Sequence, residues 1–437
     1  PGCCCMFCRS SSFSPRLCSV IKRMVESKAN RTPKRTEEEV KKLLKRYLGY
    51  KQHPVTLRQL LEIGSSDQLE AYKFLRGQIP TRLSHAILEL ESIPGPLLEQ
   101  PSVREISQKY RQSFLDLLTL PAAKEITKLS VKRKKQTLTD FSEILSAILH
   151  RHANVVATMG MGIQELKQQV TEKNEELYYL KEFLDRFYMS RIGLRTHMEQ
   201  YLNIFADAPV HNDKWVGIFS VHCDIKKIIE EAAEYTADLC RQNYCDAPPV
   251  EIHSALSDDE DAKIVYCPSH LNYIMTELLK NSMRAVVEFH GEDKLEYPPI
   301  VVNICAHERE LVIKISDQGG GISQSNQLKL FSYFYSTAHS PDLAQLRIDD
   351  SHFAGFGYGL ALARLHARYM SGDLTICPMY GYGTDVYIYI PNIDHASEVL
   401  PRLDLANLKR TSTNAGRVPN PNWMESQRLS ARNFPQV

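Results

Sequence analysis

Three short motifs follow one another in the C-terminal half of this 437-residue chain. The first, ELLKN, spans residues 277–281; the second, DQGGG, spans 317–321; the third, GFGYG, spans 355–359. The first has the apolar spacing of a helix, the second follows an apolar strand, and the third precedes an apolar helix. Together they predict a nucleotide pocket that combines a helix-borne acid and amide, an aspartate at a turn and a glycine-rich phosphate cradle.

The helix motif places Glu277 and Asn281 four residues apart, and therefore on one helix face. The carboxamide oxygen of Asn281 suits a magnesium ion that already holds waters and phosphates. The carboxylate one turn earlier can orient or deprotonate an attacking hydroxyl group. A merely exposed polar face is the alternative interpretation, because Lys280 and Arg284 lie beside the pair.

The glycine motifs provide the remaining features of the predicted pocket. Asp317 can accept the exocyclic amine of adenine, and Gly319 and Gly321 let the backbone approach the base. Backbone amides of residues 355–359, at a helix start, attract phosphate. The absence of a following GK[ST] and of a preceding βαβ unit excludes the P-loop and the dinucleotide-binding fold. Thr384 begins a strand, where its hydroxyl can meet a phosphate or order the sheet.

Hydropathy divides the chain into a helical half and a mixed half. In the helical half, apolar residues recur at steps of three and four, and prolines separate the segments, which predicts a helix bundle. The predicted helical segments are 57–77, 102–120, 137–170 and 172–205. The mixed half begins near 206–215.

In the mixed half, apolar runs predict strands between helices, and hence a sheet with helices on one face. The predicted strands are 299–306, 310–316, 373–377 and 385–390, and the predicted helices are 225–242, 269–289 and 357–371. Cys305 lies in an apolar strand and is expected to be a core thiol. The polar, glycine-bounded segment between Ile322 and Ala354 predicts a mobile lid.

The fold class predicted here is α+β, an N-terminal four-helix bundle followed by an α/β sandwich. The first 25 residues are basic, rich in serine and free of Asp and Glu, which favours mitochondrial targeting. A disordered leader, or acylation at its cysteine cluster, is the alternative. A net charge of +1 gives no general case for nucleic-acid binding, and no apolar run has the length of a membrane span. The expected division is 1–30 targeting, 31–210 helical bundle, 211–395 ATP-binding catalytic domain, and 396–437 extended tail.

The order of the motifs is more specific than any single one. A helix-borne acid and amide, then D-x-G-x-G, then G-x-G-x-G, then Gly-Thr on a strand resembles a known ATPase fold. That fold is shared by gyrase-type topoisomerases, Hsp90 chaperones, bacterial histidine kinases and mismatch-repair ATPases. No phospho-acceptor pattern of a histidine kinase accompanies it, because His85 is followed by Ala86 and Ile87.

Further segments narrow the resemblance. Residues 74–83, 151–159, 183–195 and 330–338 closely resemble the mitochondrial 2-oxo acid dehydrogenase kinases, whose members are the pyruvate dehydrogenase kinases and the branched-chain 2-oxo acid dehydrogenase kinase. The resemblance covers roughly residues 55–395. It implies a homodimeric protein serine kinase of the mitochondrial matrix that uses ATP and Mg²⁺. Such kinases phosphorylate and inactivate the dehydrogenase component and dock on lipoyl domains of the acyltransferase.

The resemblance also implies residue roles. Glu277 is the expected general base for the substrate serine, Asn281 the magnesium ligand and Asp317 the adenine acceptor. The expected nucleotide-binding residues are Asn281, Lys280, Arg284, Asp317, Gly319, Gly321, Ser336, Thr337, Gly355, Phe356, Gly357, Tyr358, Gly359 and Thr384.

A second site is expected in the bundle. His152, Arg191 and Arg195 match a family pocket for 2-oxo acids, and two arginines one turn apart can clamp a carboxylate. The alternative is a structural ion pair with a bundle acid such as Asp185. One departure lies near the base: pyruvate-specific members often carry a histidine one turn before the glutamate, where this chain has Tyr273.

The lid and the His152 segment favour pyruvate dehydrogenase as the substrate, and Trp423 partly matches a tail signature of that group. Tyr273 and the helix around Lys226 favour the branched-chain complex, which remains the alternative. A lipoyl-docking scaffold without catalysis is a remote alternative, and intact Glu277, Asn281 and Asp317 argue against it.

Overall fold

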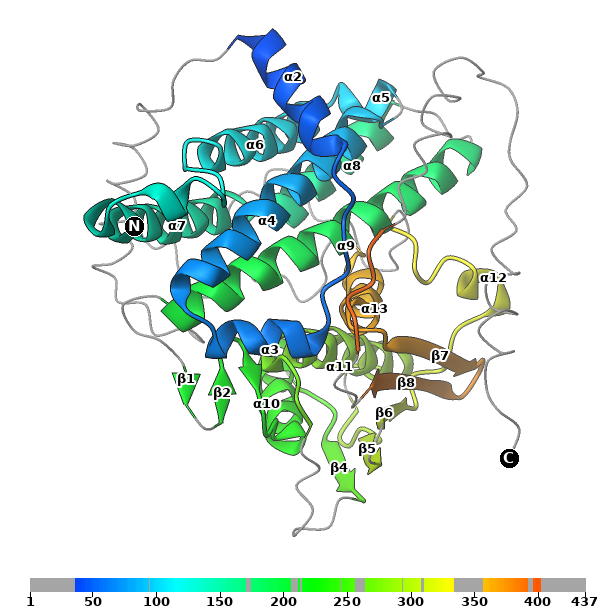
Figure 1. Cartoon of the computed structure of the whole chain (residues 1–437). Helices are drawn as coiled ribbons and strands as arrows, with labels where there is room; N and C mark the ends of the chain where they lie inside the picture. The colour runs from blue at the N-terminus through cyan, green and yellow to red at the C-terminus, as the bar shows by residue number, and fades with distance from the viewer. Residues whose placement is uncertain are drawn as a thin grey trace, which may run out of the picture. The chain divides into compact units, whose positions relative to one another are not determined.

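Figure 1 shows the protein as a computed structural model, coloured along the chain. All of the residues described below belong to one compact unit. The structure describes residues 36–93, 95–169, 174–205, 211–212, 214–244, 246–255, 264–292, 294–307, 310–333, 357–391 and 396–401. The predicted targeting segment and the predicted tail beyond Pro401, including Trp423, lie outside these residues.

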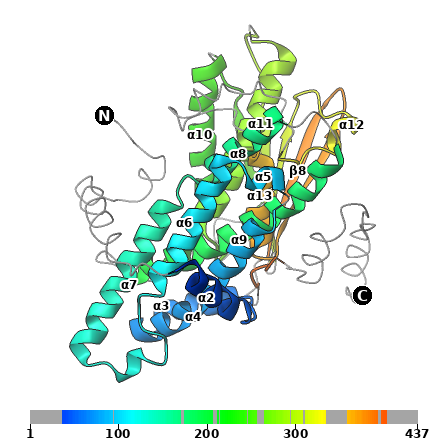
Figure 2. The same ribbon diagram turned by 90° about the horizontal axis from the view of Figure 1, so that it is seen from above.

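The first half is helical, as predicted. Figure 2 shows the long helices α4, α6, α7 and α9 running beside one another, and α4 contacts α6, α7 and α9. Tyr72, Phe141 and Tyr201 are fully buried between them. The helices are α2 (Glu37–Leu48), α3 (Leu57–Ser65), α4 (Gln68–Glu91), α5 (Gly95–Leu98), α6 (Pro101–Leu117), the short 3₁₀ helix η2 (Ile126–Lys128), α7 (Val131–Arg151), α8 (Val155–Gln169) and α9 (Asn174–Phe205).

Two helix boundaries differ from the prediction. The segment 57–77 is two helices, because the chain is extended at Asp67 and a new helix starts there. The segment 137–170 likewise breaks at His152, which ends α7. Conversely, Pro80 lies inside α4 rather than at a joint. Ile79 and Leu83 beside it are fully buried, so packing outweighs the hydrogen bond that proline removes.

The second half contains a five-stranded mixed sheet of order β4-β5-β6-β8-β7. Strand β4 pairs with β5 in parallel, and the other pairs are antiparallel. The four predicted strands are confirmed, whereas β4 and a small antiparallel sheet before it were not predicted. The strands are β1 (His211–Asn212), β2 (Trp215–Val216), β3 (Phe219–Ser220), β4 (Val250–Ser254), β5 (Ile300–His307), β6 (Glu310–Asp317), β7 (Asp373–Met379) and β8 (Gly383–Pro391).

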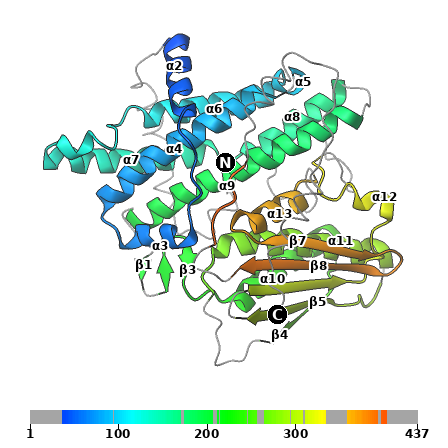
Figure 3. The same ribbon diagram turned by 45° about the vertical axis from the view of Figure 1, so that its right-hand side comes forward.

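Helices α10 (Ile225–Tyr244), α11 (Pro268–His290) and α13 (Gly359–Tyr369) lie against the sheet, as Figure 3 shows, and the short α12 (Gln324–Gln327) follows the glycine turn. Their apolar faces meet the inward side chains of the strands, such as Val302 and Ile304, in one core. The expectation that Cys305 is a core thiol is wrong. Side chains alternate along a strand, and Cys305 is exposed on the opposite side of β5 from its buried neighbour Ile304.

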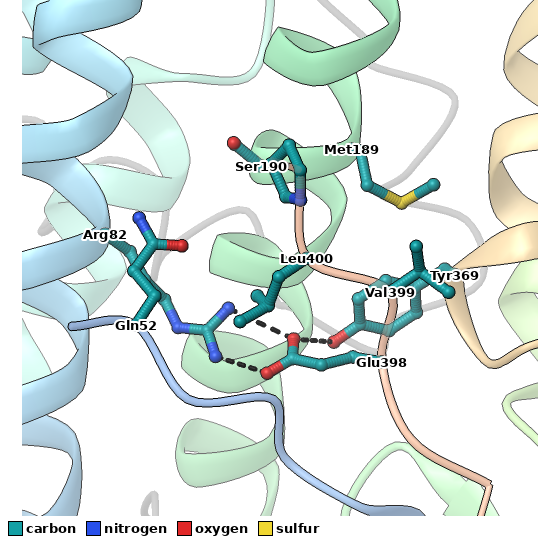
Figure 4. A pocket seen from close by; sticks show the side chains of 9 residues that line it. Gln52, Arg82, Met189, Ser190, Tyr369, Glu398, Val399 and Leu400 are labelled. Atoms are coloured by element: carbon teal, nitrogen blue, oxygen red, sulfur yellow. Dashed lines mark hydrogen bonds and ion pairs between the residues drawn. The ribbon is translucent and has the colours of Figure 1, made fainter. Parts of the chain in front are cut away.

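Residues 396–401, here called the closing strap, return to the bundle after β8. The backbone of Ala396 accepts a hydrogen bond from Leu57 N (2.8 Å), and Glu398 N donates to Val55 O (3.0 Å). The Glu398 side chain is buried and accepts from Arg82 and Tyr369, as Figure 4 shows. The cavity beside it measures about 10 Å³, which is at the lower limit for one water molecule. The strap is therefore a structural contact rather than a ligand site.

Among the described residues, no helix combines the length and the apolar composition needed to cross a bilayer.

Candidate active site

Glu277 lies in the middle of α11, where it meets the start of α13. Its Oε1 accepts from Lys280 Nζ at 2.7 Å, and its side chain is 17% exposed. A methyl group on Gly359 would lie 1.9 Å from Glu277 Oε2, so only glycine fits there without displacing the carboxylate. A half-buried carboxylate with one open side, at the N-terminus of a helix, is placed to act on a hydroxyl bound beside phosphates.

Asn281 lies one turn after Glu277 on α11 and is exposed. Its carboxamide has no hydrogen bond within the part of the chain that the structure describes, so its oxygen is available to a cation. Arg284 lies three residues after Asn281 on the same helix and forms an ion pair with Glu288 (3.2 Å). The described residues contain no group of three or more His, Cys, Asp or Glu able to hold a metal.

Asp317 ends β6 and is buried. Its Oδ1 accepts from the backbone amides of Gly319 (3.0 Å) and Thr384 (3.2 Å), and its Oδ2 accepts from Ser282 Oγ (3.1 Å). Burial raises the pKa of Asp317, and these hydrogen bonds oppose that rise. The carboxylate is thus held in one orientation, with lone pairs left to accept from a base. Ser282 was not predicted, although it directly follows Asn281.

The DQGGG turn packs between α11 and the β7–β8 hairpin. Gly321 has φ +67°, and a methyl group there would lie 2.1 Å from Met379 O, so both its conformation and its space require glycine. A methyl group on Gly319 would lie 2.7 Å from the backbone carbon of Ala285 on α11. The turn is also hydrogen-bonded to the hairpin through Gly320 and Tyr382. These contacts fix Asp317 relative to α11.

The third motif is only partly visible. Gly357 has φ +81°, and Tyr358 caps α13. The Tyr358 ring is buried against Tyr188 and Tyr333, so that any contact it makes with a nucleotide is through its backbone. Gly355, Phe356, Ser336 and Thr337 lie outside the described residues, as does most of the predicted lid.

The described beginning of the lid is attached to the bundle, which the sequence did not predict. Tyr333 is fully buried, and its hydroxyl donates to Asp185 Oδ1 at 2.7 Å. Asp185 also pairs with Lys181 (2.8 Å), and not with the arginines named as its alternative partners. The alternative of a structural ion pair with a bundle acid is therefore not met at Asp185, but Arg195 does pair with another bundle acid, Glu199. The Tyr333–Asp185 hydrogen bond attaches the described start of the predicted lid to α9.

The residues expected to form the 2-oxo acid pocket come together between α6, α7 and α9. His152 is buried, stacks on Tyr110 (4.3 Å between centroids) and shares a hydrogen bond with Ser113 (2.9 Å). Burial and the charges of Arg191 and Arg151 lower the pKa of His152 to about 3, so it is neutral at pH 7. A neutral imidazole can hydrogen-bond a carboxylate or a carbonyl group without adding charge.

The two arginines of this pocket are held differently. Arg191 Nη2 donates to the carbonyls of His152 (3.0 Å) and Ala153 (3.3 Å), whereas Arg195 pairs with Glu199 one turn later. Among the described residues, the buried Nε of Arg191 and the hydroxyl groups of Tyr110 and Tyr188 have no hydrogen-bond partner. Buried polar groups without partners are uncommon, and here they surround one guanidinium. This arrangement fits a small anion with acceptor oxygens.

The polar atoms and the space at the predicted nucleotide site also fit their expected ligand, ATP. It offers an oriented buried acceptor, two glycines packed so tightly that side chains are excluded, and a helix start beside a carboxylate. A single free carboxamide oxygen suits Mg²⁺, which binds one or two protein ligands together with phosphates and waters rather than a complete protein cage.

Comparisons with known proteins agree with this geometry. A family model described as mitochondrial branched-chain alpha-ketoacid dehydrogenase kinase matches residues 54–220, and one described as histidine kinase-, DNA gyrase B- and HSP90-like ATPase matches residues 267–393. The chain is 37% identical over 392 residues to a mitochondrial pyruvate dehydrogenase (acetyl-transferring) kinase of Drosophila melanogaster, which covers 87% of this chain and 91% of the relative.

Two human relatives show similar agreement. Mitochondrial pyruvate dehydrogenase (acetyl-transferring) kinase isozyme 4 is 38% identical over 362 residues, covering 82% of this chain and 85% of the relative. Isozyme 3 is 37% identical over 377 residues, covering 85% and 90%. The two family models together account for both halves of the fold, with an ATP-binding domain in the second. The chain therefore belongs to the mitochondrial pyruvate and branched-chain 2-oxo acid dehydrogenase kinases, a family of protein serine kinases.

Proposed function

We propose that this kinase phosphorylates a serine of the dehydrogenase component of the mitochondrial pyruvate dehydrogenase complex and thereby inactivates it. The observation that carries this proposal is the arrangement of Glu277, Asn281 and Asp317 around one helix and one glycine turn, in a chain whose relatives bear pyruvate dehydrogenase kinase names. We assign residues 211–395 to catalysis and residues 31–210 to regulation and docking. Of the predicted tail, 396–437, the closing strap at 396–401 packs on the bundle, and we assign the rest to a tail.

In this proposal Asp317 accepts the adenine amine, because its Oδ atoms are already oriented by Gly319, Ser282 and Thr384. The backbone at the start of α13 receives phosphate, since helix N-termini attract anions. Asn281 holds Mg²⁺, which when bound neutralises charge on the transferred phosphoryl group. Glu277 takes the proton of the substrate serine as the serine oxygen attacks the γ-phosphorus, while the bond from that phosphorus to the bridging oxygen breaks and ADP leaves.

Lys280 has two partners available in this scheme. In the structure it pairs with Glu277 at 2.7 Å. A nucleotide brings phosphate oxygens to the same side of α11, and an ammonium group on a flexible stem can turn towards them. That movement would free Glu277 Oε1 for the serine. Arg284 lies further along the same helix than Lys280 and contributes positive charge at a greater distance from Glu277.

The expected partners and compartment follow from the proposed kinase reaction. We propose docking on the lipoyl domain of the acyltransferase component, assembly as a homodimer and action in the mitochondrial matrix, where the target complex works. Relatives that carry the word mitochondrial in their names support this compartment.

We further propose that the pocket of His152, Arg191 and Arg195 binds a 2-oxo acid as a regulatory ligand. The unpartnered polar atoms around Arg191 support this. Replacing Arg191 by methionine should abolish the effect of pyruvate on kinase activity while leaving activity without pyruvate within a few fold. An unchanged response to pyruvate would refute the pocket.

The decisive experiment uses purified protein, labelled ATP and either the pyruvate or the branched-chain dehydrogenase complex, followed by mapping of the labelled serine. We expect label in the pyruvate complex and none with Glu277→Gln. Preferential labelling of the branched-chain complex would favour the alternative that Tyr273 suggests. Lipoyl-domain binding without any transfer would indicate a scaffold.

A further inference from the structure

A row of polar rings lies directly behind Glu277, in the seam between α11 and α13. The helices pack in opposite directions, so moving back along α11 from Glu277 corresponds to moving forward along α13 from Gly359. His366 is two turns after Gly359 and therefore on the same face of α13. Its ring lies 4.7 Å from that of Tyr273 and 4.8 Å from that of His270, which are one and two turns before Glu277.

The contact between α11 and α13 contains polar rings at positions where apolar side chains would also pack. His270 is buried and His366 is half-buried, and among the described residues the buried Nδ1 atom of His366 has no hydrogen-bond partner. Burial lowers the pKa of both imidazoles, so both are neutral at pH 7. A leucine in place of His366 would pack without leaving a polar atom unpaired, so the histidine calls for an explanation other than stability.

Tyr273 provides the connection to the base. It is on the same face of α11 as Glu277, one turn earlier. Burial, followed by the negative charge of Glu277, raises the pKa of Tyr273 well above its ordinary value. Its hydroxyl therefore stays protonated, and towards a carboxylate it can only donate. Once Lys280 leaves Glu277 for the phosphates, Tyr273 is a neutral donor one turn away on the same helix.

We propose that Tyr273 and His366 are a positioning pair for Glu277. The Tyr273 hydroxyl donates a hydrogen bond to the carboxylate when Lys280 turns to the nucleotide, and the His366 imidazole, packed on the Tyr273 ring from α13, holds that ring in the required orientation. This inference rests on the proposed kinase function. It assigns to α13, whose start receives the phosphates, a second role in orienting the base.

The test measures phosphate transfer to the dehydrogenase complex and, separately, ATP affinity by calorimetry, using the full chain. Tyr273→Phe should lower kcat about tenfold, the effect of losing one hydrogen bond to a charged group, with the Kd for ATP unchanged. His366→Leu should lower kcat to a similar extent, and the double variant should be no slower than the slower single variant, because both act through one contact. His366→Asn, which returns a polar atom near the position of Nδ1, should recover part of the rate.

The matched control is Tyr244→Phe, because Tyr244 also donates to a carboxylate on α11, Glu288 at 3.2 Å. It should leave kcat unchanged. Wild-type kcat in Tyr273→Phe and in His366→Leu, additive losses in the double variant, or an equal loss of ATP affinity would each overturn the pair. Glu277→Gln, assayed alongside, separates the two proposals. If it keeps wild-type activity, the base assignment itself fails. If it is inactive while both ring variants are normal, only the pair is refuted.

Discussion

Replacing Glu398 by glutamine should loosen the closing strap. The side chain is fully buried, and four groups from distant parts of the unit converge on it. Arg82 reaches both oxygens, Val55 N donates to Oε1 at 2.8 Å, Tyr369 donates to Oε2 at 3.2 Å, and His197 lies 3.4 Å from Oε2. These groups belong to α4, to the segment before α3, to α13 and to α9, so one carboxylate joins the bundle to the ATP-binding half.

The expected loss follows from the burial of both charges. Arg82 and Glu398 are 4% and 0% exposed, and removing one partner of such a pair leaves the other charge buried without compensation. That costs about 3–5 kcal/mol. A large domain shifts its Tm by about 2 °C per kcal/mol, so Glu398→Gln should lower the Tm by roughly 6–10 °C.

Calorimetry on the purified chain measures this shift. The exposed pair Arg58–Glu62 provides the control, with side chains 65% and 61% exposed. Glu62→Gln should change the Tm by no more than about 1 °C, because exposed pairs contribute little. If Glu398→Gln is as mild as that control, the strap does not hold the two halves together and the reasoning is wrong.

The same variant has a pH signature. Burial alone would raise the pKa of Glu398, but the His197 hydrogen bond and the Arg82 charge lower it to about 2, against an ordinary 4.5. A carboxylate with a lowered pKa contributes stability that is complete above the unfolded value and is lost as the pH falls through the folded one. The difference is equivalent to about 3 kcal/mol. Between about pH 5 and pH 3 the wild-type Tm should therefore fall more steeply than that of Glu398→Gln, and parallel curves would contradict this.

Three further predictions follow, two on the nucleotide site and one on the attachment of Tyr333 to the bundle. Asp317→Asn should weaken ATP binding at least tenfold in calorimetry, because the amide cannot accept from adenine in the same way, with little change in Tm; unchanged affinity would remove Asp317 from the site. Gly321→Ala should lower both the Tm and ATP affinity, since the left-handed backbone and the nearby Met379 carbonyl leave no room; a neutral result would show that the turn can rearrange. Tyr333→Phe, which removes the hydrogen bond to Asp185, should speed proteolysis of the lid without altering the fold, and an unchanged cleavage rate would argue against this anchor.

The parts of the fold that sequence predicted well are those where local pattern and burial agree. Strands β5 and β6 and helix α11 combine apolar periodicity with contacts to one core, and none of their bounds differs from the prediction by more than one residue. Strand β4 was missed because it is a polar edge strand with mostly exposed side chains. Cys305 was misplaced because an almost continuous apolar strand hides the alternation that decides which side is buried.

Some residues of the candidate site could likewise be proposed from sequence, and others could not. Glu277, Asn281 and Asp317 could be proposed as site residues from the spacing and order of the motifs, but two hydrogen-bond partners of Asp317, Ser282 and Thr384, lie 35 and 67 residues away. Tyr333 and Glu398 could not, because their partners lie 148 and 316 residues away in sequence. Only the folded chain reveals which distant acid or arginine completes such a contact.

The packing of Glu277 on Gly359 has a consequence for how activity could be controlled. A methyl group on Gly359, the first residue of α13, would lie 1.9 Å from Glu277 Oε2, so a side chain at this position would displace the carboxylate. A small tilt of α13, or a single methyl group at residue 359, would displace the Glu277 carboxylate from its position. A variant altered in this way would remain folded and could still bind nucleotide, but it would not transfer phosphate.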